Sequence, residues 1–254
     1  MNGILKGVVK FLNTDKLSDR LATVAKYVPN GVKLADIGSD HAYLPCFLAK
    51  NGSITFAVAG EVVEGPFQSA ARNVQSEGLA DIVSVRLGDG LEVIEPGEVN
   101  CITIAGMGGA LIANILELGK EKLPTVERLI LQPNISASSI RKWLLEHQWE
   151  LIEEEILEED GKIYEVLVAE KGEPLKPYKN IQSELGLLVG PYLLHKKDET
   201  FKKKWRMEKE NWKRIYSQLE GAAPSAETEL KKQELLDKIK MVEEALGNEN
   251  SERS

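Results

Sequence analysis

The first candidate functional residues of this sequence are two aspartates on either side of a single glycine. They stand at the end of an apolar run. Residues 32–37 predict a strand covered on both faces, and the chain then turns at Gly38 between Asp36 and Asp40. The three-glycine spacing of a dinucleotide site is absent, and two carboxylates would repel a phosphate. They suit a ligand with an amine or another cationic group, of which S-adenosylmethionine is the commonest. An ordinary strand-to-helix turn without a ligand is the alternative.

Acids and glycines also follow the next two strands that the pattern predicts. Glu61 lies at the end of the second strand, where a carboxylate can accept hydrogen bonds from ribose hydroxyls. Asp89 and Gly90 follow the third strand, where an acid can reach the exocyclic amine of adenine. Because the carboxyl ends of parallel strands share one edge of a sheet, we expect these residues to form one ligand site.

Two more strands and a hairpin complete the first part of the chain. The fourth strand is expected to end in a glycine-rich loop over residues 106–109, and the fifth in Gln132 and Asn134. Alternating apolar residues on both sides of Asp160-Gly161 predict a tight antiparallel hairpin. Five strand–helix units followed by a hairpin predict an α/β fold with a doubly wound sheet and a terminal antiparallel pair.

The C-terminal third repeats apolar residues at alternating four- and three-residue spacing. The repeats cover residues 201–219 and 235–246, with a short polar break between them. They predict an antiparallel α-helical coiled coil, which either packs or dimerises, or binds a partner as an arm. With the proline- and lysine-bearing stretch before them, they divide the chain into two expected domains: a catalytic domain over residues 1–172 and a helical hairpin over residues 173–254.

Positive charge gathers locally although the net charge is −8. The first helix of the hairpin carries more lysine and arginine than acid, which is the expected footprint of a phosphate backbone. The segment before residue 36 is also basic and includes Lys6 and Lys10. For Lys26 a solvated helix face is the alternative. The residues expected to contact RNA are Arg20, Lys26, Lys202, Lys203, Lys204 and Arg206.

Length and composition exclude several classes of protein. The 254 residues are enough for a substantial core and for an enzyme. No apolar run approaches the ~20 residues of a membrane span, and the start does not resemble a secretory signal. Cys46 and Cys101 lack a metal-binding spacing and are expected to be core thiols in a reducing compartment. We therefore expect a cytoplasmic protein without a membrane or metal partner, monomeric or forming a weak dimer.

Six strings of the sequence together point to one family. They are LADIGSDHAYLP, AGEVVEGPFQSA, GDGLEVI, ITIAGMGGALI, LILQPN and EEDGKIYEVLVAE. In combination they resemble the bacterial tRNA (adenine-22, N1)-methyltransferase family, class I S-adenosylmethionine enzymes with a C-terminal coiled-coil domain. The resemblance covers residues 17 to about 246. It implies a class I methyltransferase-type sheet and methyl transfer from S-adenosyl-L-methionine to N1 of an adenine, at position 22, in tRNA.

Carried over by position, the resemblance also implies roles for individual residues. The turn after the first strand would hold the methionine part of the cofactor, Glu61 the ribose, Asp89 the adenine, and the loop after Ala105 would lie near the sulfonium. The implied cofactor-binding residues are Asp36, Gly38, Ser39, Glu61, Val62, Asp89, Gly90, Ala105, Gly106, Met107 and Gly108.

The residues after the first turn are candidates for handling the target adenine. An extruded base needs a stacking surface and a hydrogen-bond partner, which Tyr43 and either Asp40 or His41 can supply. An imidazole can also take a proton near neutral pH. A structural role is the alternative for His41, and a contact with the cofactor amine for Asp40. The alternatives for the whole chain are a methyltransferase for another RNA, a protein or a small molecule, and a non-catalytic RNA-binding protein with a degenerate fold.

Overall fold

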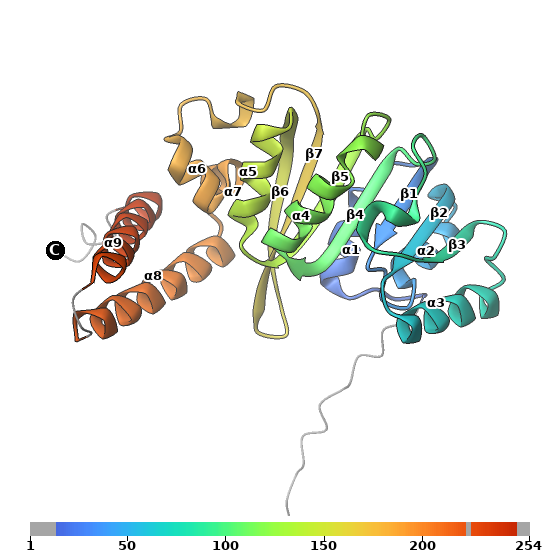
Figure 1. Cartoon of the computed structure of the whole chain (residues 1–254), viewed down its shortest axis with the longest axis horizontal. Helices are drawn as coiled ribbons and strands as arrows, with labels where there is room; N and C mark the ends of the chain where they lie inside the picture. Colours follow the sequence, from blue (N-terminus) through green and yellow to red (C-terminus); the bar gives the residue numbers. More distant parts are fainter. Residues whose placement is uncertain (1–13, 222–224, 248–254) are drawn as a thin grey trace, which may run out of the picture. The chain divides into compact units, whose positions relative to one another are not determined.

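Seven strands form one mixed sheet in the order β3-β2-β1-β4-β5-β7-β6 (Figure 1). The computed structural model describes residues 14–221 and 225–247. Lys6 and Lys10, two of the basic residues noted above, lie outside these ranges. The strands are β1 (Val32–Ile37), β2 (Ile54–Glu61), β3 (Val83–Leu87), β4 (Cys101–Gly108), β5 (Arg128–Ile135), β6 (Trp149–Glu159) and β7 (Lys162–Lys171).

Nine α-helices and three short 3-10 helices are found within the described ranges. The α-helices are α1 (Asp19–Lys26), α2 (Tyr43–Lys50), α3 (Glu64–Ser76), α4 (Gly109–Leu118), α5 (Ala137–Glu146), α6 (Ser183–Val189), α7 (Pro191–Lys196), α8 (Glu199–Glu220) and α9 (Ala226–Leu246). The 3-10 helices are η1 (Gly90–Val93), η2 (Lys120–Lys122) and η3 (Lys176–Tyr178). In these parts of the chain, no helix has the length and apolar character needed to cross a membrane.

Contacts divide the chain into two compact units. The first runs to Ala105 and includes Ile115–Leu131, and the second consists of Gly106–Asn114 and the chain from Gln132 onward. The predicted division into functional domains at residue 172 stays a prediction.

The first unit contains a parallel sheet whose central strand is buried on both faces. β1 pairs in parallel with β2 and with β4, and β2 pairs in parallel with β3. All residues of β1 except Lys33 are buried, as the apolar run predicts for a strand covered by helices on both sides. Cys46 and Cys101 are buried free thiols, and burial raises their pKa values to about 11 and about 12. Both cysteines are therefore core residues, as predicted.

The second unit is built on the β6–β7 hairpin. Its antiparallel register pairs Glu159 with Lys162, so that Asp160 and Gly161 form a two-residue turn. Both turn residues have positive φ, +50° and +75°, which a type I′ turn requires. The predicted hairpin is confirmed.

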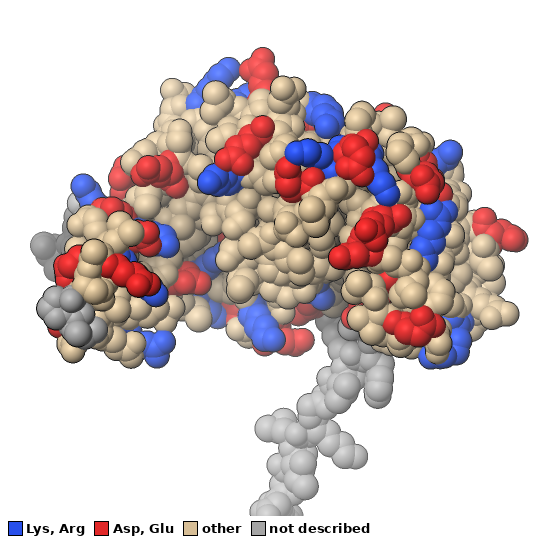
Figure 2. Space-filling view, viewed as in Figure 1, with Lys and Arg blue, Asp and Glu red and all other residues tan. Residues whose placement is uncertain are grey.

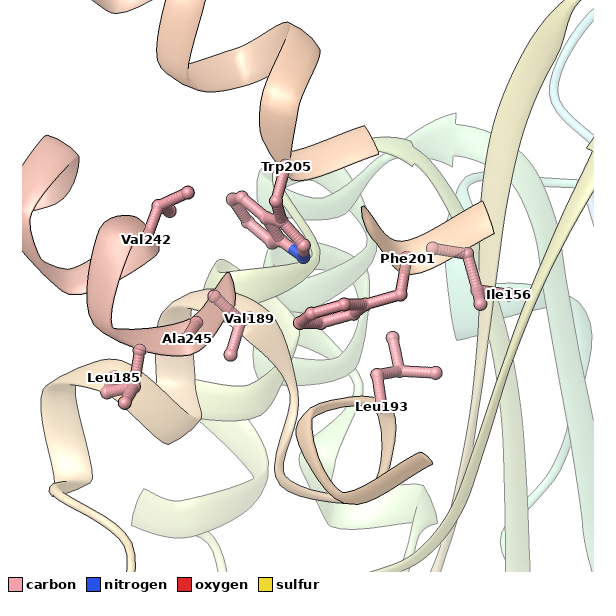
Figure 3. Close-up of a cluster of buried hydrophobic side chains, with 8 residues drawn as sticks. All are labelled: Ile156, Leu185, Val189, Leu193, Phe201, Trp205, Val242 and Ala245. Carbon is pink, nitrogen blue, oxygen red and sulfur yellow. The ribbon is translucent and has the colours of Figure 1, made fainter. Parts of the chain in front are cut away.

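Helices α6 to α9 share a hydrophobic cluster with this hairpin (Figure 3). Phe201 and Trp205 of α8 pack there with Val242 of α9 and Ile156 of β6. Helices α8 and α9 contact each other along their lengths, as the two apolar repeats predict. Whether they supercoil as a regular coiled coil stays a prediction.

Two parts of the second unit differ from the sequence-based expectation. Helices α6 and α7 were not predicted, because seven and six residues interrupted by Gly190 are too short for a helical repeat to stand out. The expected loop over residues 106–109 is absent: β4 continues to Gly108 and α4 begins at Gly109. Side chains of β5 bond both backbone groups of Gly106 and hold this part of the backbone in place.

Candidate functional site

The turn after β1 is held by a buried carboxylate. Asp36 is 4% exposed and accepts hydrogen bonds from Ser39 Oγ at 2.5 Å and Thr103 Oγ1 at 2.6 Å. The backbone N–H groups of Gly38 and Ser39 both donate to the Gly60 carbonyl, at 2.9 and 3.1 Å. Burial raises the pKa of Asp36, and the two hydroxyl hydrogen bonds oppose that shift. Asp36 therefore fixes the shape of the turn as well as adding an acid to it.

Three consecutive residues after this turn are in the left-handed region of backbone space. Asp40, His41 and Ala42 have φ values of +42°, +66° and +57°, although none is glycine. Residues held in this way concentrate at functional sites. The Asn73 side chain of α3 stabilises the turn by donating to the His41 carbonyl at 2.8 Å. The sequence does not show that residues 40–42 adopt left-handed backbone conformations. It also does not show that Asn73 bonds His41, because the two residues lie 32 positions apart in the chain.

The side chains of the three candidate catalytic residues lie close to one another. His41 Nε2 is 3.6 Å from Asp40 Oδ1, and the His41 and Tyr43 ring centroids are 5.4 Å apart. The Asp40 side chain is 84% exposed and that of His41 45%. An imidazole that lies beside a carboxylate can act as a general acid or base.

Glu61, at the end of β2, has a buried oxygen without a partner. The residue is 7% exposed, and its Oε1 makes no hydrogen bond with the described residues. Burial raises the pKa of Glu61, while a hydrogen bond from the Asp40 backbone lowers it. An unsatisfied buried acceptor costs stability unless a donor reaches it. A ribose hydroxyl is a donor of the required kind, and the adjacent Val62 is 63% exposed.

The residues that follow β3 are hydrogen-bonded to the end of β2. The Gly88 N–H donates to the Glu61 carbonyl at 2.9 Å, and Asp89 with Glu92 forms a capping box on η1. Gly90 has a φ of +53°, and a Cβ there would lie 3.1 Å from an Ile115 methyl group. In the first unit, the structure thus brings the turn after β1 together with the ends of β2 and β3. Thr103, which bonds Asp36, was missed because its hydroxyl lies in an otherwise apolar strand.

In the second unit, the predicted residues Gly106, Met107 and Gly108 form the end of β4. The Gly106 N–H donates to Gln132 Oε1 at 3.0 Å, and Asn134 Nδ2 donates to the Gly106 carbonyl at 2.7 Å. Gly106 has a φ of +80° and is exposed. The amides predicted at the end of β5 therefore position this backbone.

The basic residues of α8 are engaged with acids of the second unit. Lys202 pairs with Glu199 at 2.7 Å, Lys203 with Glu158 at 2.6 Å, and Lys204 with Glu165. On the face in Figure 2, blue and red side chains alternate over α8 and α9. The lysine stripe read from the sequence is therefore partly neutralised by acids from β6, β7 and α8 itself.

A buried ion network was missed by the sequence analysis. Arg141 of α5 is fully buried and bonds Glu154 of β6 at 2.6 Å and Glu165 of β7. Burial raises the pKa of Glu154, whereas for Glu165 the charges of Arg141 and Lys204 outweigh burial and lower the pKa. These charges are far apart in sequence and follow no motif, so only the fold shows that they pair.

The seven-stranded mixed sheet with helices is a Rossmann-like fold of the class I methyltransferase type, and acids lie at or just after the carboxyl ends of β1, β2 and β3. A family model described as tRNA (adenine(22)-N(1))-methyltransferase matches residues 34–244. The chain belongs to this family, and the predicted resemblance and fold class are confirmed.

Individual relatives agree with this assignment. The chain is 54% identical over 237 residues to the tRNA (adenine(22)-N(1))-methyltransferase of Bacillus subtilis, covering 93% of this chain and 100% of that protein. The crystal structure of the B. subtilis M1A22 tRNA methyltransferase TrmK superposes with a TM-score of 0.89 at 53% identity, over 92% of this chain and 100% of the other. Streptococcus pneumoniae Sp1610, solved in complex with S-adenosyl-L-methionine, gives a TM-score of 0.80 at 44% identity, over 91% and 100%.

Proposed function

We propose that this chain transfers the methyl group of S-adenosyl-L-methionine to N1 of the adenine at position 22 of tRNA. The observation that carries the proposal is family membership over residues 34–244. It favours tRNA over the alternative substrates, and an enzyme over a non-catalytic RNA-binding protein. We place this activity in the cytoplasm, in a protein that is monomeric or forms a weak dimer.

The residues of the first unit fit the cofactor. The unpartnered Oε1 of Glu61 is a ready acceptor for a ribose hydroxyl. We assign the methionine side to Asp36, Gly38 and Ser39, and the adenine to Asp89 with Gly90. Val62, Ala105, Gly106, Met107 and Gly108 complete the proposed set. When bound, the cofactor supplies an electrophilic methyl group on its sulfonium.

The target base needs positioning more than activation. Ring N1 of adenine carries its own lone pair, so that a base is required only to take a proton from the methylated product. We assign this proton to His41, which Asp40 faces at 3.6 Å and whose ring Tyr43 supports.

Contacts with the RNA are proposed for basic residues of both units. Arg20 and Lys26 lie on α1, and Lys202, Lys203, Lys204 and Arg206 on α8. Because the three lysines already pair with carboxylates, they would have to exchange these partners for phosphates. We expect a smaller salt dependence of tRNA binding than their number suggests.

Methyl incorporation into an unmodified tRNA transcript tests the proposal. A transcript with adenine at position 22 should be methylated, and one with guanine there should not, although both bind. Calorimetric titration of S-adenosylmethionine gives an independent readout of the cofactor site. Binding of the cofactor without labelling of either transcript would overturn the proposed substrate, and equal labelling of both would overturn the proposed position.

A further inference from the structure

The second unit contains a cavity of about 460 Å³ that the proposed function does not use. The end of β5, the β6–β7 hairpin and one face of α8 line it. Its volume lies within the ~300–1,000 Å³ typical of small-ligand sites, and a nucleoside fits such a volume.

Two exposed apolar side chains and a half-buried aromatic ring line this cavity. Ile135 and Met207 are 70% and 58% exposed. Both border the cavity together with Tyr164 of β7. Apolar side chains around a hollow mark a binding surface, and an aromatic ring is a stacking surface for a nucleobase.

Polar groups in the same lining match the edge of a base that carries an amine. Asn134 Nδ2 donates to the Gly106 carbonyl at 2.7 Å, so the Asn134 side-chain oxygen remains as an acceptor. Glu208 adds a second acceptor. Lys162 adds a cation that makes no ion pair with any residue in the described ranges, whereas Lys204 is paired with Glu165. Adenine presents an exocyclic amine as donor and ring nitrogens as acceptors.

The cavity also lies at the edge of the sheet where ligands bind. Asn134 and Ile135 are at the carboxyl end of β5, and Gly106 is near the carboxyl end of β4. In open α/β sheets this is the edge that holds substrates.

We propose that this cavity receives the adenine that is methylated, with Tyr164 as its stacking surface and Asn134 as the acceptor for its exocyclic amine. This inference rests on the proposed function and refines it. The stacking surface for the base is Tyr164, while Tyr43 supports the His41 ring. Asn134 is then a specificity-determining residue. Its side-chain oxygen can accept a hydrogen bond from the exocyclic amine of adenine, whereas guanine presents the acceptor O6 at that position.

Single-turnover methylation with saturating S-adenosylmethionine tests the stacking surface. Tyr164→Ala should slow methyl transfer to an unmodified transcript roughly tenfold or more, because base–aromatic stacking is worth about 1–3 kcal/mol. Tyr164→Phe keeps the ring and should retain most of the rate. Met207→Ala should slow it less than Tyr164→Ala. The matched control is Leu230→Ala, which removes an exposed apolar side chain of α9 away from the cavity and should leave the rate unchanged.

Cross-linking locates the base directly and does not depend on how stable these variants are. A transcript with 8-azidoadenosine at position 22, irradiated with the wild-type protein, should label the peptides that contain Tyr164 or Met207. A cross-linked complex without label on the Tyr164 and Met207 peptides would overturn the inference, and so would a wild-type rate in a folded Tyr164→Ala variant. Absence of methylation by the wild-type protein would instead overturn the proposed function, so that the two failures are distinguishable.

Discussion

Glu61 places a carboxylate oxygen inside the first unit where no described group bonds it. Asp36, in the same unit, has a bond to each oxygen. The two acids therefore play different parts. Asp36 is satisfied by the protein and shapes the turn, whereas one carboxylate oxygen of Glu61 receives no hydrogen bond from the described residues.

Replacing Glu61 tests this difference. Glu61→Ala should weaken S-adenosylmethionine binding by about 1–3 kcal/mol, or roughly five- to 150-fold in Kd, because a hydrogen bond to a charged acceptor is lost. The free energy of unfolding of the ligand-free protein should fall less than the binding free energy, because the substitution also removes a buried oxygen that has no hydrogen bond from the described residues. Calorimetry and thermal unfolding measure the two effects. The control is Glu64→Ala at the exposed start of α3; equal Kd values for both variants would contradict the assignment.

Asp36 should make stability depend on pH. Burial raises its pKa in the folded protein, so the folded state binds more protons than the unfolded state above the unfolded pKa of about 3.9. The contribution of Asp36 is therefore fully present below that pH and is lost as pH rises through the folded pKa. We expect the free energy of unfolding of the wild type, relative to Asp36→Asn, to decrease across this window in urea titrations. A difference that grows with pH would show that the folded pKa is lowered instead.

At the scale of elements, backbone contacts decide how strands lead into helices. β4 passes into α4 without a loop, and a Cβ at Gly109 would lie 2.1 Å from the Ser136 carbonyl oxygen. Such an approach between two backbones leaves room only for glycine. The end of β4 and the start of α5 are thereby held together in the second unit.

Gly109→Ala should therefore destabilise the protein although it adds a good helix former. Elsewhere in a helix the same change stabilises by about 0.5–1 kcal/mol, but here the clash with fixed backbone should cost about 1–3 kcal/mol or more. Gly65→Ala in α3 is the matched control, because no atom lies within 4 Å of its Cβ position. Urea unfolding compares the two. Equal free energies of unfolding for Gly109→Ala and Gly65→Ala would contradict this prediction. They would mean that the backbone at Ser136 moves away without loss of stability.

At the scale of the whole molecule, the C-terminal helices share their core with the sheet. Phe201 of α8 is fully buried in a cluster that includes Ile156 of β6, and Lys204 of α8 pairs with Glu165 of β7. Glu165 in turn bonds the buried Arg141 of α5. These contacts connect α8 to the hairpin through both apolar packing and charge.

Removing residues 179–254 should consequently destabilise the second unit, beyond any loss of tRNA binding. The truncation uncovers Ile156 and removes Lys204, so that the buried carboxylates of Glu154 and Glu165 share a single cation, Arg141. Proteolysis and circular dichroism should show a loosened β6–β7 hairpin. A chain shortened only at residue 247 serves as the control. An unchanged unfolding midpoint after the long truncation would show that the helical region is an independent domain.

Local patterns in the sequence predicted the strands and the longer helices, but not α6, α7 or the continuation of β4 to Gly108. The buried run of β1, the Asp160-Gly161 turn and the apolar repeats of α8 and α9 are short-range signals, and each predicted the observed element. The alternation of strands and helices predicted the doubly wound sheet, whereas the order β3-β2-β1-β4-β5-β7-β6 was not predicted. The sequence by itself thus determined the fold class, the family and the positions of Asp36, Glu61 and Asp89.

Tertiary structure decided what these residues are paired with. Thr103 reaches Asp36 across 67 residues, Asn73 reaches the strained turn at His41 across 32, and Arg141 finds Glu165 across 24. It also paired Lys203 and Lys204 of α8 with acids of β6 and β7, and left Glu61 Oε1 without a hydrogen bond from the described residues. The physical reason is that hydrogen bonds, burial and charge pairing depend on distance in space, and no local repeat records which distant side chains the packed chain brings within about 3 Å.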